Sequence, residues 1–566
     1  MSDSFTVMGI HDNHNASVSL LVDGRIRFLL QEERINRVKN FNGFPREAIR
    51  RCLRWSGLTL DDIDLFAFGT VHNPPWRDQA GLIRYYGRSG AVKSARDIFR
   101  ASPLFRAYQA YAAGRRRKFL EEQGIPGGKV RLYDHHLAHA GSALYGSGFR
   151  DGEVLIFTLD GGGDGKCAAV YRSDGEGGIL PVAATPEGHS VGNIYSNTTY
   201  YLGMTPLEHE YKLMGMAPYC QSRYSAPVAG KLSGMLDVRG LSFARRTWSP
   251  TSSCLPLLCQ YYHRERFDSI CGGLQEFTED LVLRWIRNGI GETGIHRVCL
   301  SGGVFMNVKL NKRILELPEV EDLFIVPSCG DESNPIGAAY LAYRDHCRET
   351  GTVPRFSPLG DLYLGEEFDD HAIREEIARH GLECQKLDRV EPYTAELLAE
   401  DRIVARFSGR AEWGARALGN RSILANPSSF ANVQRINDAI KMRDFWMPFA
   451  ATVLDTWEGR YLRNPKKIPS PYMILSFDTL TGARDIVAGI HPKDRTIRPQ
   501  VLASAFNPGY YRVLEEFARL TGIGGVLNTS FNLHGEPMVY HPADAIHTWL
   551  NSGLDSLILD RYAITR

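Results

Sequence analysis

The chain has 566 residues and a mass of 63.4 kDa, more than one hydrophobic core usually organises, so the sequence predicts two domains or three small ones. Its 66 Lys and Arg against 65 Asp and Glu give a formal net charge of +1, which excludes a basic nucleic-acid coat and an acidic disordered tail. The ten cysteines include no CxxC pair, so a disulfide scaffold or a structural zinc module is disfavoured. No stretch approaches about 18 apolar residues and the start has no signal pattern, so we expect a cytoplasmic protein with no membrane contact.

Short apolar segments that end in polar or glycine-rich turns recur through the first 345 residues. Residues 5–10 predict a strand, and 16–22 with 25–30 predict a hairpin around an Asp-Gly turn. Strands that deliver polar residues and glycines at their carboxyl ends build the ligand sites of α/β proteins, so these turns are candidate sites. Further strands are predicted at 154–159, 297–300 and 323–326, then a helix at 335–346, a linker in the turn-rich passage 352–362, and later strands at 403–407 and 525–527.

The segment DHHLAHA at 134–140 places His135 and His139 four residues apart. On a helix they share one face and can chelate one cation, whereas His136 lies about 100° round the helix. Structural histidines are an equally good interpretation of this motif alone. Asp160 and Asp331 both follow apolar strands and can complete the set of ligands, although each alone is typical of a turn or a helix cap. Two histidines and two aspartates suit iron or zinc better than magnesium.

A second polar pair, Asp12 and His14, lies in the turn after the first predicted strand. A histidine close to a carboxylate can act as a general base, because the carboxylate fixes its tautomer and raises its basicity. A solvated turn of polar residues is the alternative interpretation.

Two glycine turns, GGGDG at 161–165 and SGG at 301–303, follow predicted strands. Backbone without side chains lets a phosphate or a ribose approach closely and leaves N–H groups free to donate. Neither turn belongs to a GxxxxGK[ST] loop or a GxGxxG fingerprint, so a nucleotide bound here would use another fold.

Together these motifs resemble the O-carbamoyltransferase family of nodulation and antibiotic-biosynthesis proteins, the NodU/CmcH type. In the first part of the chain the resemblance rests on HHLAHA, the strand with DGGGDG, EYKLMGMAPY (210–219), LSGGVFMNVKLN (300–311) and GDESNPIGAA (330–339). In the later part it rests on EWGARALGNRSILANP (412–427), NDAIKMRDFWMPFA (437–450) and NTSFNLHGEPMV (528–539). It spans almost the whole chain.

The resemblance implies an α/β protein of two domains. Residues 1–355 would form an actin/sugar-kinase-like domain, a duplicated ribonuclease-H-like fold similar to the tRNA threonylcarbamoyl-transfer protein, and residues 356–566 a YrdC-like domain. The implied activity is that of an ATP-dependent O-carbamoyltransferase. The second domain would make carbamoyl-adenylate from carbamoyl phosphate and ATP, and the first would transfer the carbamoyl group to a hydroxyl of a small natural-product acceptor. Mg²⁺ could accompany ATP, and a homodimer is left open.

The resemblance also assigns residues in the first domain. Fe²⁺ or another divalent transition metal would bind the two histidines and two aspartates, with Asp12 and His14 as the catalytic pair. Lys212 matches a family Lys-x-Met-Gly segment, with an exposed surface lysine as a nearly equal alternative, and Lys39 matches a basic position of unassigned role. The residues expected at the nucleotide or adenylate are Lys39, Gly161, Gly162, Lys212, Gly302, Gly303 and Asn307.

The segment 401–450 has eight Arg and Lys against four Asp and Glu, so it is locally +4 in a balanced chain. Guanidinium groups suit phosphate oxygens, and two phosphorylated substrates must be gathered here, although a solvated basic face is the alternative. Family members commonly have an arginine where Met447 stands, which puts one phosphate contact in doubt. The residues expected to bind carbamoyl phosphate and ATP are Arg416, Arg421, Lys441, Arg443 and Arg498, with Ser530 and Asn532 as polar contacts.

Other functions compete with this prediction. A tRNA threonylcarbamoyl-modification-type protein shares both domain types, but the neutral charge argues against a nucleic-acid partner. The hydrogenase-maturation carbamoyltransferase resembles a longer chain with paired-cysteine zinc motifs, and a non-catalytic nucleotide-binding regulator would not need the catalytic pair and the metal set. The basic run 115–118 is expected on a solvated helix face, with the guidance of anionic substrates as the alternative interpretation. The acceptor pocket is expected in variable loops at 73–105 and 221–265. The aromatic residues there, most of them expected in the core, are Trp76, Tyr85, Tyr86, Trp248, Tyr261 and Tyr262.

Overall fold

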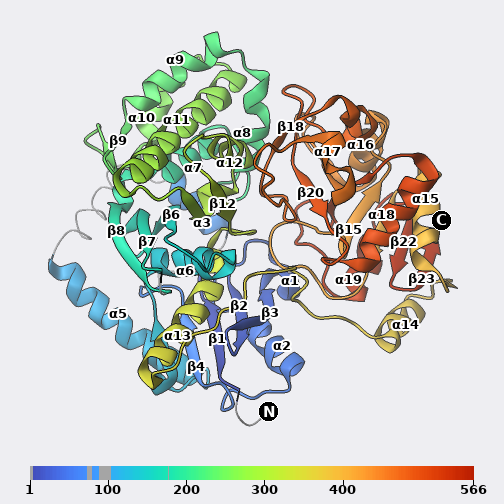
Figure 1. Cartoon of the computed structure of the whole chain (residues 1–566), viewed down its shortest axis with the longest axis horizontal. Coiled ribbons are helices and arrows are strands. Elements are labelled where there is room, and N and C mark those ends of the chain that lie inside the picture. Colours follow the sequence, from blue (N-terminus) through green and yellow to red (C-terminus); the bar gives the residue numbers. More distant parts are fainter. Residues whose placement is uncertain (1–3, 73–78, 88–102, 176) are drawn as a thin grey trace. The chain divides into compact units, whose positions relative to one another are not determined.

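The computed structural model describes residues 4–72, 79–87, 103–175 and 177–566. Contacts between residues divide the chain into two compact units (Figure 1). Unit 1 comprises Met1–Glu32 and Asn40–Leu359, and unit 2 comprises Glu33–Lys39 and Gly360–Arg566. A short segment near the start of the chain therefore groups with its carboxyl-terminal part. Compactness alone does not show that a unit folds by itself, so the domains predicted at 1–355 and 356–566 stay a prediction.

The first sheet of unit 1 has the strand order β3-β2-β1-β4-β5. β1 (Thr6–His11), β2 (Ser17–Val22) and β3 (Arg25–Gln31) form an antiparallel meander, and β4 (Leu65–Phe68) and β5 (Val130–Leu132) extend it parallel to β1. Every residue of β1 is buried, as expected for a strand covered on both faces.

The second sheet of unit 1 repeats the topology of the first. β6 (Leu155–Gly163), β7 (Lys166–Ser173) and β8 (Ile179–Pro186) form the antiparallel meander, and β11 (Arg297–Ser301) and β12 (Asp322–Ile325) follow parallel to β6. The order β8-β7-β6-β11-β12 therefore matches β3-β2-β1-β4-β5 strand for strand. Such a repeat is the duplication that distinguishes the actin/sugar-kinase-like fold, so the predicted α/β class and the duplicated first part are confirmed.

Two helices of unit 1, α6 (His135–Ser147) and α13 (Asn334–Thr350), approach each other closely. A Cβ on Gly337 would lie 1.7 Å from the carbonyl oxygen of Ala138, and a Cβ on Gly141 would lie 3.0 Å from that of Gly337. Only glycines let the two backbones come this near. The other helices and strands described in unit 1 are α2 (Arg46–Ser56), α3 (Gln79–Gly87), α5 (Pro103–Glu122), α7 (Val191–Tyr201), α8 (Glu210–Met216), α9 (Ser222–Ser233), α10 (Leu255–Tyr261), α11 (Phe267–Thr293), α12 (Val308–Leu315) and the hairpin β9 (Leu236–Arg239) and β10 (Ser242–Arg245).

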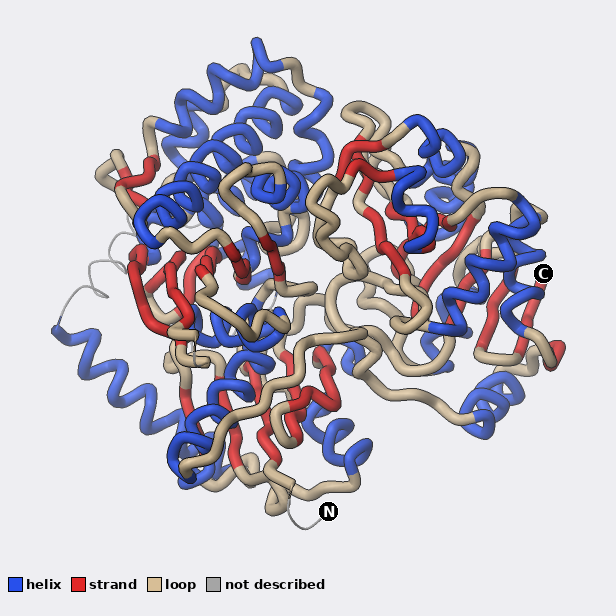
Figure 2. Tube along the Cα trace, viewed as in Figure 1, coloured by secondary structure: helices blue, strands red, loops and turns tan. Residues whose placement is uncertain are grey.

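Unit 2 is built on an eight-stranded mixed sheet of order β13-β23-β22-β14-β15-β21-β16-β20 (Figure 2). Neighbouring residues of its central strands face opposite cores: Ile423 and Leu527 belong to one, and Leu424 and Val526 to the other. Helices therefore cover both faces. α14 (Asp370–Arg379) and α19 (Pro542–Leu550) complete the first core, and α15 (Val390–Ala399) and α18 (Pro508–Thr521) complete the second.

The remaining elements of unit 2 are short. Three of them form a small separate sheet of order β17-β18-β19. The short elements of unit 2 are α1 (Glu33–Asn36), β13 (Gln385–Lys386), β14 (Val404–Phe407), β15 (Arg421–Ala425), α16 (Phe430–Ile436), a π-helix (Asn437–Lys441), β16 (Ala450–Leu454), α17 (Glu458–Tyr461), β17 (Leu462–Arg463), β18 (Phe477–Thr479), β19 (Thr496–Ile497), β20 (Pro499–Leu502), β21 (Gly525–Ser530), β22 (Ser556–Leu559) and β23 (Tyr562–Thr565).

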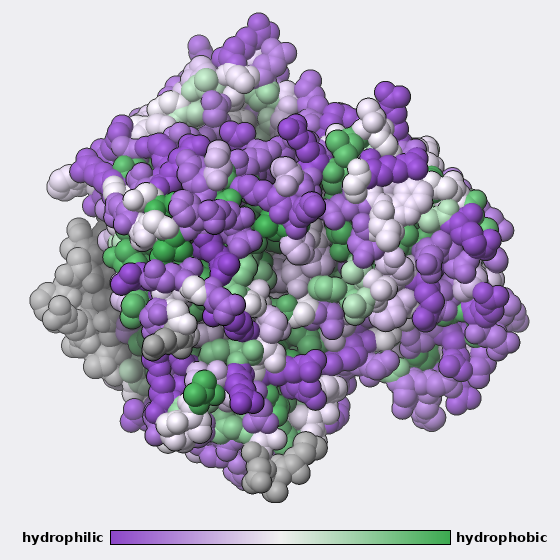
Figure 3. All heavy atoms as spheres, in the orientation of Figure 1, coloured by the Kyte–Doolittle hydropathy of each residue, from purple (hydrophilic) through white to green (hydrophobic). Residues whose placement is uncertain are grey.

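The predicted elements are present with shifted ends. β1 starts and ends one residue later than predicted, and β12 one residue earlier. β6 runs past Leu159 through the glycines, because Gly163 pairs with Lys166 of β7 beyond an irregularity in the ladder. Hydrophilic side chains prevail on the face drawn in Figure 3. Among the described residues, none of the helices has the length and apolar character that crossing a membrane requires.

Candidate functional site

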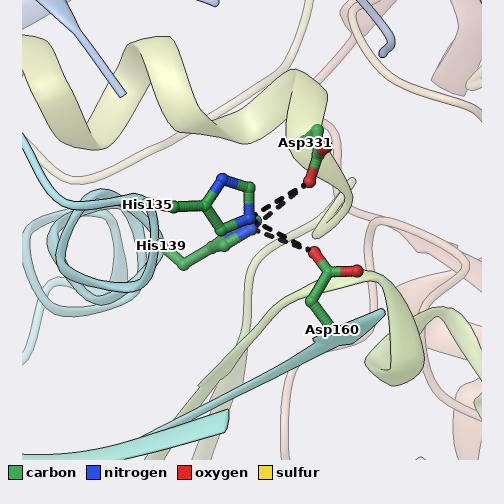
Figure 4. Close-up of side chains that lie close together, drawn as sticks. All are labelled: His135, His139, Asp160 and Asp331. Atoms are coloured by element: carbon green, nitrogen blue, oxygen red, sulfur yellow. Dashed lines mark ion pairs between the residues drawn. The ribbon is translucent and has the colours of Figure 1, made fainter. Parts of the chain in front are cut away.

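His135, His139, Asp160 and Asp331 meet in unit 1 and form the candidate metal centre (Figure 4). Both histidines project from the start of α6, Asp160 from β6, and Asp331 from a single helical turn (Asp331–Ser333) that precedes α13. Asp160 Oδ2 lies 3.6 Å from His135 Nε2 and 3.3 Å from His139 Nε2. Asp331 Oδ1 lies 3.5 and 3.6 Å from the same two nitrogens. The structure therefore brings together all four residues that the sequence predicts as metal ligands.

All four ligand atoms lie within 4.8 Å of one another, close enough to hold one divalent cation. The four His-to-Asp distances lie near the separation of about 3.4 Å between ligands that are each about 2.1 Å from a tetrahedral ion. His135 Nε2 and Asp160 Oδ2 are buried and have no hydrogen-bond partner among the described residues, a costly arrangement that a cation between them would relieve. Two imidazoles and two carboxylates suit iron or zinc better than magnesium.

Without a cation, the groups of the centre stabilise one another's charged forms. Burial lowers the pKa of His135, but Asp331 and Asp160 outweigh it and raise that pKa to about 9. Burial raises the pKa of Asp331, yet His135, His11 and His139 hold it well below its usual range. An incoming cation must therefore displace a proton from His135 at neutral pH.

Neighbouring groups aim the two histidines. Ser301 Oγ lies 3.0 Å from His139 Nδ1, which leaves Nε2 of that ring to face the carboxylates. A Cβ on Gly163 would lie 2.3 Å from the His135 ring, so a glycine there makes room for this ring. The first turn of α6 is fixed by Asp134, whose carboxylate accepts from the N–H groups of His136 and Leu137.

His136 takes no part in the centre. Its Nδ1 lies 2.8 Å from Thr158 Oγ1. Burial, together with the neighbouring His135 and His139, lowers the pKa of His136 to about 3, so the ring stays neutral. The helical spacing in DHHLAHA predicts this separation of roles.

Asp12 forms a buried ion pair with Arg116 of α5. Arg116 Nη2 lies 2.9 and 3.1 Å from the two carboxylate oxygens, and Nη1 donates to the carbonyls of Thr70 and Val71. The side chain of Asp12 is fully buried and that of Arg116 is 4% exposed. The prediction of a solvated helix face is therefore wrong for Arg116, although the other three residues of the run 115–118 are exposed.

His14 lies in the turn after β1, where its backbone forms an isolated bridge with Asn42. Its side chain is partly exposed, in contrast to the buried Asp12 two residues before it. The joint catalytic role assigned to Asp12 and His14 stays a prediction.

Asp164, in the GGGDG turn, ties the start of α6 to the loop after β4. Its carboxylate accepts hydrogen bonds from Thr70 Oγ1 at 3.2 Å and from the N–H groups of Val71, His72 and His135, each at 2.9 Å. Because Arg116 holds the carbonyls of the same loop, one polar network runs from Asp12 to the metal helix. The sequence signal for this clamp is an aspartate within a glycine turn, a pattern that does not by itself predict the partners of the carboxylate.

The two glycine turns lie at one edge of the second sheet, because β6 and β11 are parallel neighbours. Gly302 has a φ of 104°, and a Cβ there would lie 2.3 Å from the carbonyl oxygen of Leu159. A Cβ on Gly303 would lie 3.3 Å from Asp160 Oδ1, so the turn runs beside the metal centre. The glycines predicted to contact a nucleotide are Gly161, Gly162, Gly302 and Gly303, and that role stays a prediction.

Three further predicted nucleotide residues lie apart from these turns in the chain. Asn307 caps α12, accepting from Leu310 N at 3.1 Å, and its amide exchanges two hydrogen bonds with Gln275. Lys212 is half-buried on α8, and Lys39 belongs to unit 2. Their contacts with a nucleotide stay predictions.

In unit 2 the buried ammonium of Lys441 lies against Ser530 and Asn532. It donates to the carbonyl and hydroxyl oxygens of Ser530 and, at 3.2 and 2.7 Å, to the main-chain and side-chain oxygens of Asn532. Ser530 is the last residue of β21, so the turn that follows brings Asn532 back to the lysine. Three of the residues predicted to bind substrate thus meet at one strand end.

Positive charges gather around this lysine. Burial, with Arg443 and Lys39, holds the pKa of Lys441 well below its usual value. Burial, with Arg416 and Arg443, does the same for Arg498. We name Lys39, Arg416, Lys441, Arg443 and Arg498 the cationic cluster. A bound anion would lower the electrostatic repulsion among cations crowded in this way.

Arg421 is placed differently from the cluster. Its guanidinium lies 3.6 Å from the centre of the Phe407 ring and donates to the carbonyls of Ser408, Gly409 and Asn420. Burial lowers the pKa of Arg421 to about 10. The Nη groups of Arg421 already donate to main-chain carbonyls, and its contact with a phosphate stays a prediction. Met447, at the position where the family resemblance leads us to expect an arginine, is buried.

The predicted acceptor loops differ from expectation. Most of 73–105 lies outside the described residues, Trp76 included. The segment 221–265 is not a loop, since it contains α9, the β9–β10 hairpin and α10. Tyr262 and Tyr86 are buried, as expected of core residues, whereas Trp248 is 96% exposed.

Comparisons with known proteins identify the family. The model described as Carbamoyltransferase N-terminus matches residues 6–340, and that described as Carbamoyltransferase C-terminus matches 395–566. Nodulation protein NolNO of Sinorhizobium fredii is 31% identical over 98% of this chain and 79% of the relative. Nodulation protein NolO of Bradyrhizobium diazoefficiens is 31% identical over 76% and 79%, and Nodulation protein U of Rhizobium tropici 24% identical over 97% and 95%.

Solved structures add little to this. Component A of the (R)-2-hydroxyglutaryl-CoA dehydratase of Acidaminococcus fermentans is 13% identical with a TM-score of 0.33, over 60% of this chain and 98% of that one, and nothing about function follows from so weak a likeness.

The resemblance inferred from the motifs is confirmed by the family models and the nodulation proteins. The chain is a transferase enzyme that belongs to the carbamoyltransferase family.

Proposed function

We propose that this carbamoyltransferase is driven by ATP. Unit 2 forms carbamoyl-adenylate from carbamoyl phosphate and ATP, and unit 1 transfers the carbamoyl group to a hydroxyl of a small natural-product acceptor. The observation that carries the proposal is the cationic cluster, in which five basic side chains gather, and where burial, together with neighbouring cations, holds the pKa values of Lys441 and Arg498 well below their usual range. A site with such a charge excess suits substrates that bring several phosphate groups.

The reaction in unit 2 balances with one water. Carbamoyl phosphate and water give carbamate and phosphate, and a carbamate oxygen then attacks the α-phosphorus of ATP, which releases pyrophosphate. Lys441 and the arginines would hold the phosphate oxygens and offset the charge that develops on them. The product, carbamoyl-adenylate, has a better leaving group than carbamoyl phosphate for attack by an alcohol.

Transfer in unit 1 needs an acceptor oxygen freed of its proton. His14, partly exposed in the turn after β1, is the proposed base, and the buried pair of Asp12 and Arg116 holds the start of that turn. The acceptor oxygen forms a bond to the carbamoyl carbon, and AMP leaves. A divalent metal on His135, His139, Asp160 and Asp331 would supply a Lewis acid that polarises the carbamoyl or phosphate oxygens.

Product analysis tests the proposal. The protein is incubated with ATP, radiolabelled carbamoyl phosphate and a panel of hydroxylated metabolites, and we expect AMP, pyrophosphate and phosphate in equal amounts together with a labelled acceptor. ADP as the nucleotide product would overturn the adenylate route. Equal carbamoylation with and without ATP would overturn the requirement for ATP.

Two variants separate the proposed half-reactions. His14→Ala should retain the release of pyrophosphate and lose transfer, and Arg498→Ala should lose pyrophosphate release and retain bound metal. The exposed His296→Ala in unit 1 and Arg484→Ala in unit 2 are controls that should leave both steps unchanged. Loss of both steps in His14→Ala, with metal content and folding intact, would contradict the assignment of one step to each unit.

A further inference from the structure

His11 is a third histidine beside the candidate metal centre. It is the last residue of β1, its side chain is fully buried, and its ring centroid lies 6.3 Å from that of His135. Its Nε2 lies 3.7 Å from Asp331 Oδ2. His11 faces the metal centre, whereas Asp12, the first residue after the strand, contacts Arg116.

Neither ring nitrogen of His11 has a hydrogen-bond partner among the described residues. An unsatisfied buried polar group lowers the stability of the fold, and native proteins pair nearly all such groups. Packing alone therefore does not account for a fully buried histidine with two unpaired ring nitrogens at this position, which points to a functional role.

The two oxygens of Asp331 have different surroundings. Oδ1 lies 3.5 and 3.6 Å from the Nε2 atoms of the two ligand histidines, so it faces the position of a cation. Oδ2 faces His11 instead. A carboxylate that binds a metal through one oxygen is ordinarily held by a hydrogen bond to the other. A rotation that shortens the contact between Oδ2 and Nε2 to about 3 Å is enough to form that bond.

We infer that His11 is a fifth residue of the metal centre, which acts through Asp331: its Nε2–H donates to Oδ2 and holds Oδ1 toward the cation. Direct coordination is less consistent with the geometry. Among the described residues, the ligand atoms that lie within 4.8 Å of one another come from His135, His139, Asp160 and Asp331, without His11. The inference concerns metal binding alone and does not depend on the carbamoyl chemistry proposed above.

Substitutions that keep or remove the Nε2 donor test this role. Gln places its amide nitrogen near the position of Nε2, whereas Asn places it nearer Nδ1 and Phe removes both nitrogens. Loss of such a supporting hydrogen bond weakens metal binding by about 10- to 100-fold. We therefore expect His11→Phe and His11→Asn to bind Zn²⁺ and Co²⁺ weaker by that factor, and His11→Gln to bind within about threefold of the wild type.

The control is Val7→Ala, a fully buried position on the same face of β1, which should lower stability and leave metal affinity unchanged. Affinities are measured by competition with a chelator, and the ligand set by the visible absorption of the Co²⁺ form. Unchanged affinity in folded His11→Phe, or in His11→Asn if the Phe variant does not fold, would overturn the inference. So would equal loss in His11→Gln with a changed Co²⁺ spectrum, since that outcome indicates direct coordination.

Discussion

Arg116 Nη2 contacts both carboxylate oxygens of Asp12, at 2.9 and 3.1 Å, in the interior of unit 1. The pair is closed to solvent, and the same guanidinium donates to two main-chain carbonyls of the loop after β4. Asp12 is therefore held in place by a guanidinium that is itself fixed to the main chain. This geometry suits a carboxylate that orients the chain near His14.

Breaking this pair from either side should be costly. Arg116→Met is expected to lower the free energy of unfolding by about 3–5 kcal/mol, because it removes the cation that pairs with the buried Asp12 carboxylate. Asp12→Asn removes the anion that pairs with the buried guanidinium of Arg116, so we expect it to lower the free energy of unfolding as well. In the double variant the loss should be clearly smaller than the sum of the two, as measured by urea unfolding. Arg117→Met, exposed on the same helix, should change stability by less than about 0.5 kcal/mol, and additive losses would contradict the pairing.

Metal uptake by the metal-free protein should release a proton below about pH 9. The pKa of His135 is raised to about 9, and only the neutral imidazole binds a cation. The apparent affinity for Zn²⁺ should therefore fall about tenfold for each pH unit below 9. Calorimetry in two buffers of different ionisation enthalpy counts the proton, and His139→Ala should abolish uptake. An affinity that does not change between pH 7 and 9 would disprove the raised pKa.

The same pKa shift sets a pH dependence of stability in the metal-free protein. The folded-state pKa of His135 lies above its value of about 6.5 in the unfolded chain. Its contribution to stability is therefore fully present below about pH 6.5 and is lost as the pH rises through about 9. Saturating Zn²⁺ should remove this dependence, because the ligand histidine is then neutral at every pH tested.

Lys441 should produce the opposite trend in unit 2. Its pKa is lowered in the folded state by burial, Arg443 and Lys39, so the folded form binds fewer protons than the unfolded form. Stability should therefore rise with pH from the lowered pKa up to about 10.5, the value in the unfolded chain. Bound pyrophosphate should flatten this dependence of stability on pH, because an anion favours the charged form of Lys441. Lys441→Met should flatten it without anion, whereas the exposed Lys493→Met should leave it unchanged.

The contact between α6 and α13 predicts an intolerant glycine. Gly337→Ala would place a Cβ 1.7 Å from the carbonyl oxygen of Ala138, so the two helices must separate and carry Asp331 away from the histidines. We expect a large loss of stability together with weaker Zn²⁺ binding. Gly230→Ala, in an exposed part of α9 with nothing within 4 Å of the new Cβ, is the control. It should be neutral or stabilise by up to about 1 kcal/mol.

The four metal ligands could be predicted because each carries a local signal. His135 and His139 have helical spacing, and Asp160 and Asp331 follow apolar strands whose carboxyl ends share an edge. The repeated sheet topology followed from the motifs that carry the family resemblance. Lys441, Ser530 and Asn532 were likewise predicted as members of one binding region, and they are in contact.

The residues that escaped prediction are those whose chemistry arises from packing between distant segments. Arg116 belongs to a run of exposed cations, and only the neighbouring Asp12 distinguishes it from the other three. His11 and Asp164 lie beside residues with stronger signals and become important through partners far along the chain. The grouping of Glu33–Lys39 with unit 2 likewise has no local signal, because it depends on contacts with residues beyond 410.

The carboxylate of Asp164 also couples the motions of two segments. It accepts from the amides of Val71 and His72 in the loop after β4 and from the amide of His135 at the start of α6. Hydrogen exchange at each of these amides requires that its hydrogen bond to Asp164 break, and withdrawal of this carboxylate breaks all three bonds at once. We therefore expect an opening of the loop of the first sheet and of the metal helix that exposes all three amides together, with one shared opening free energy.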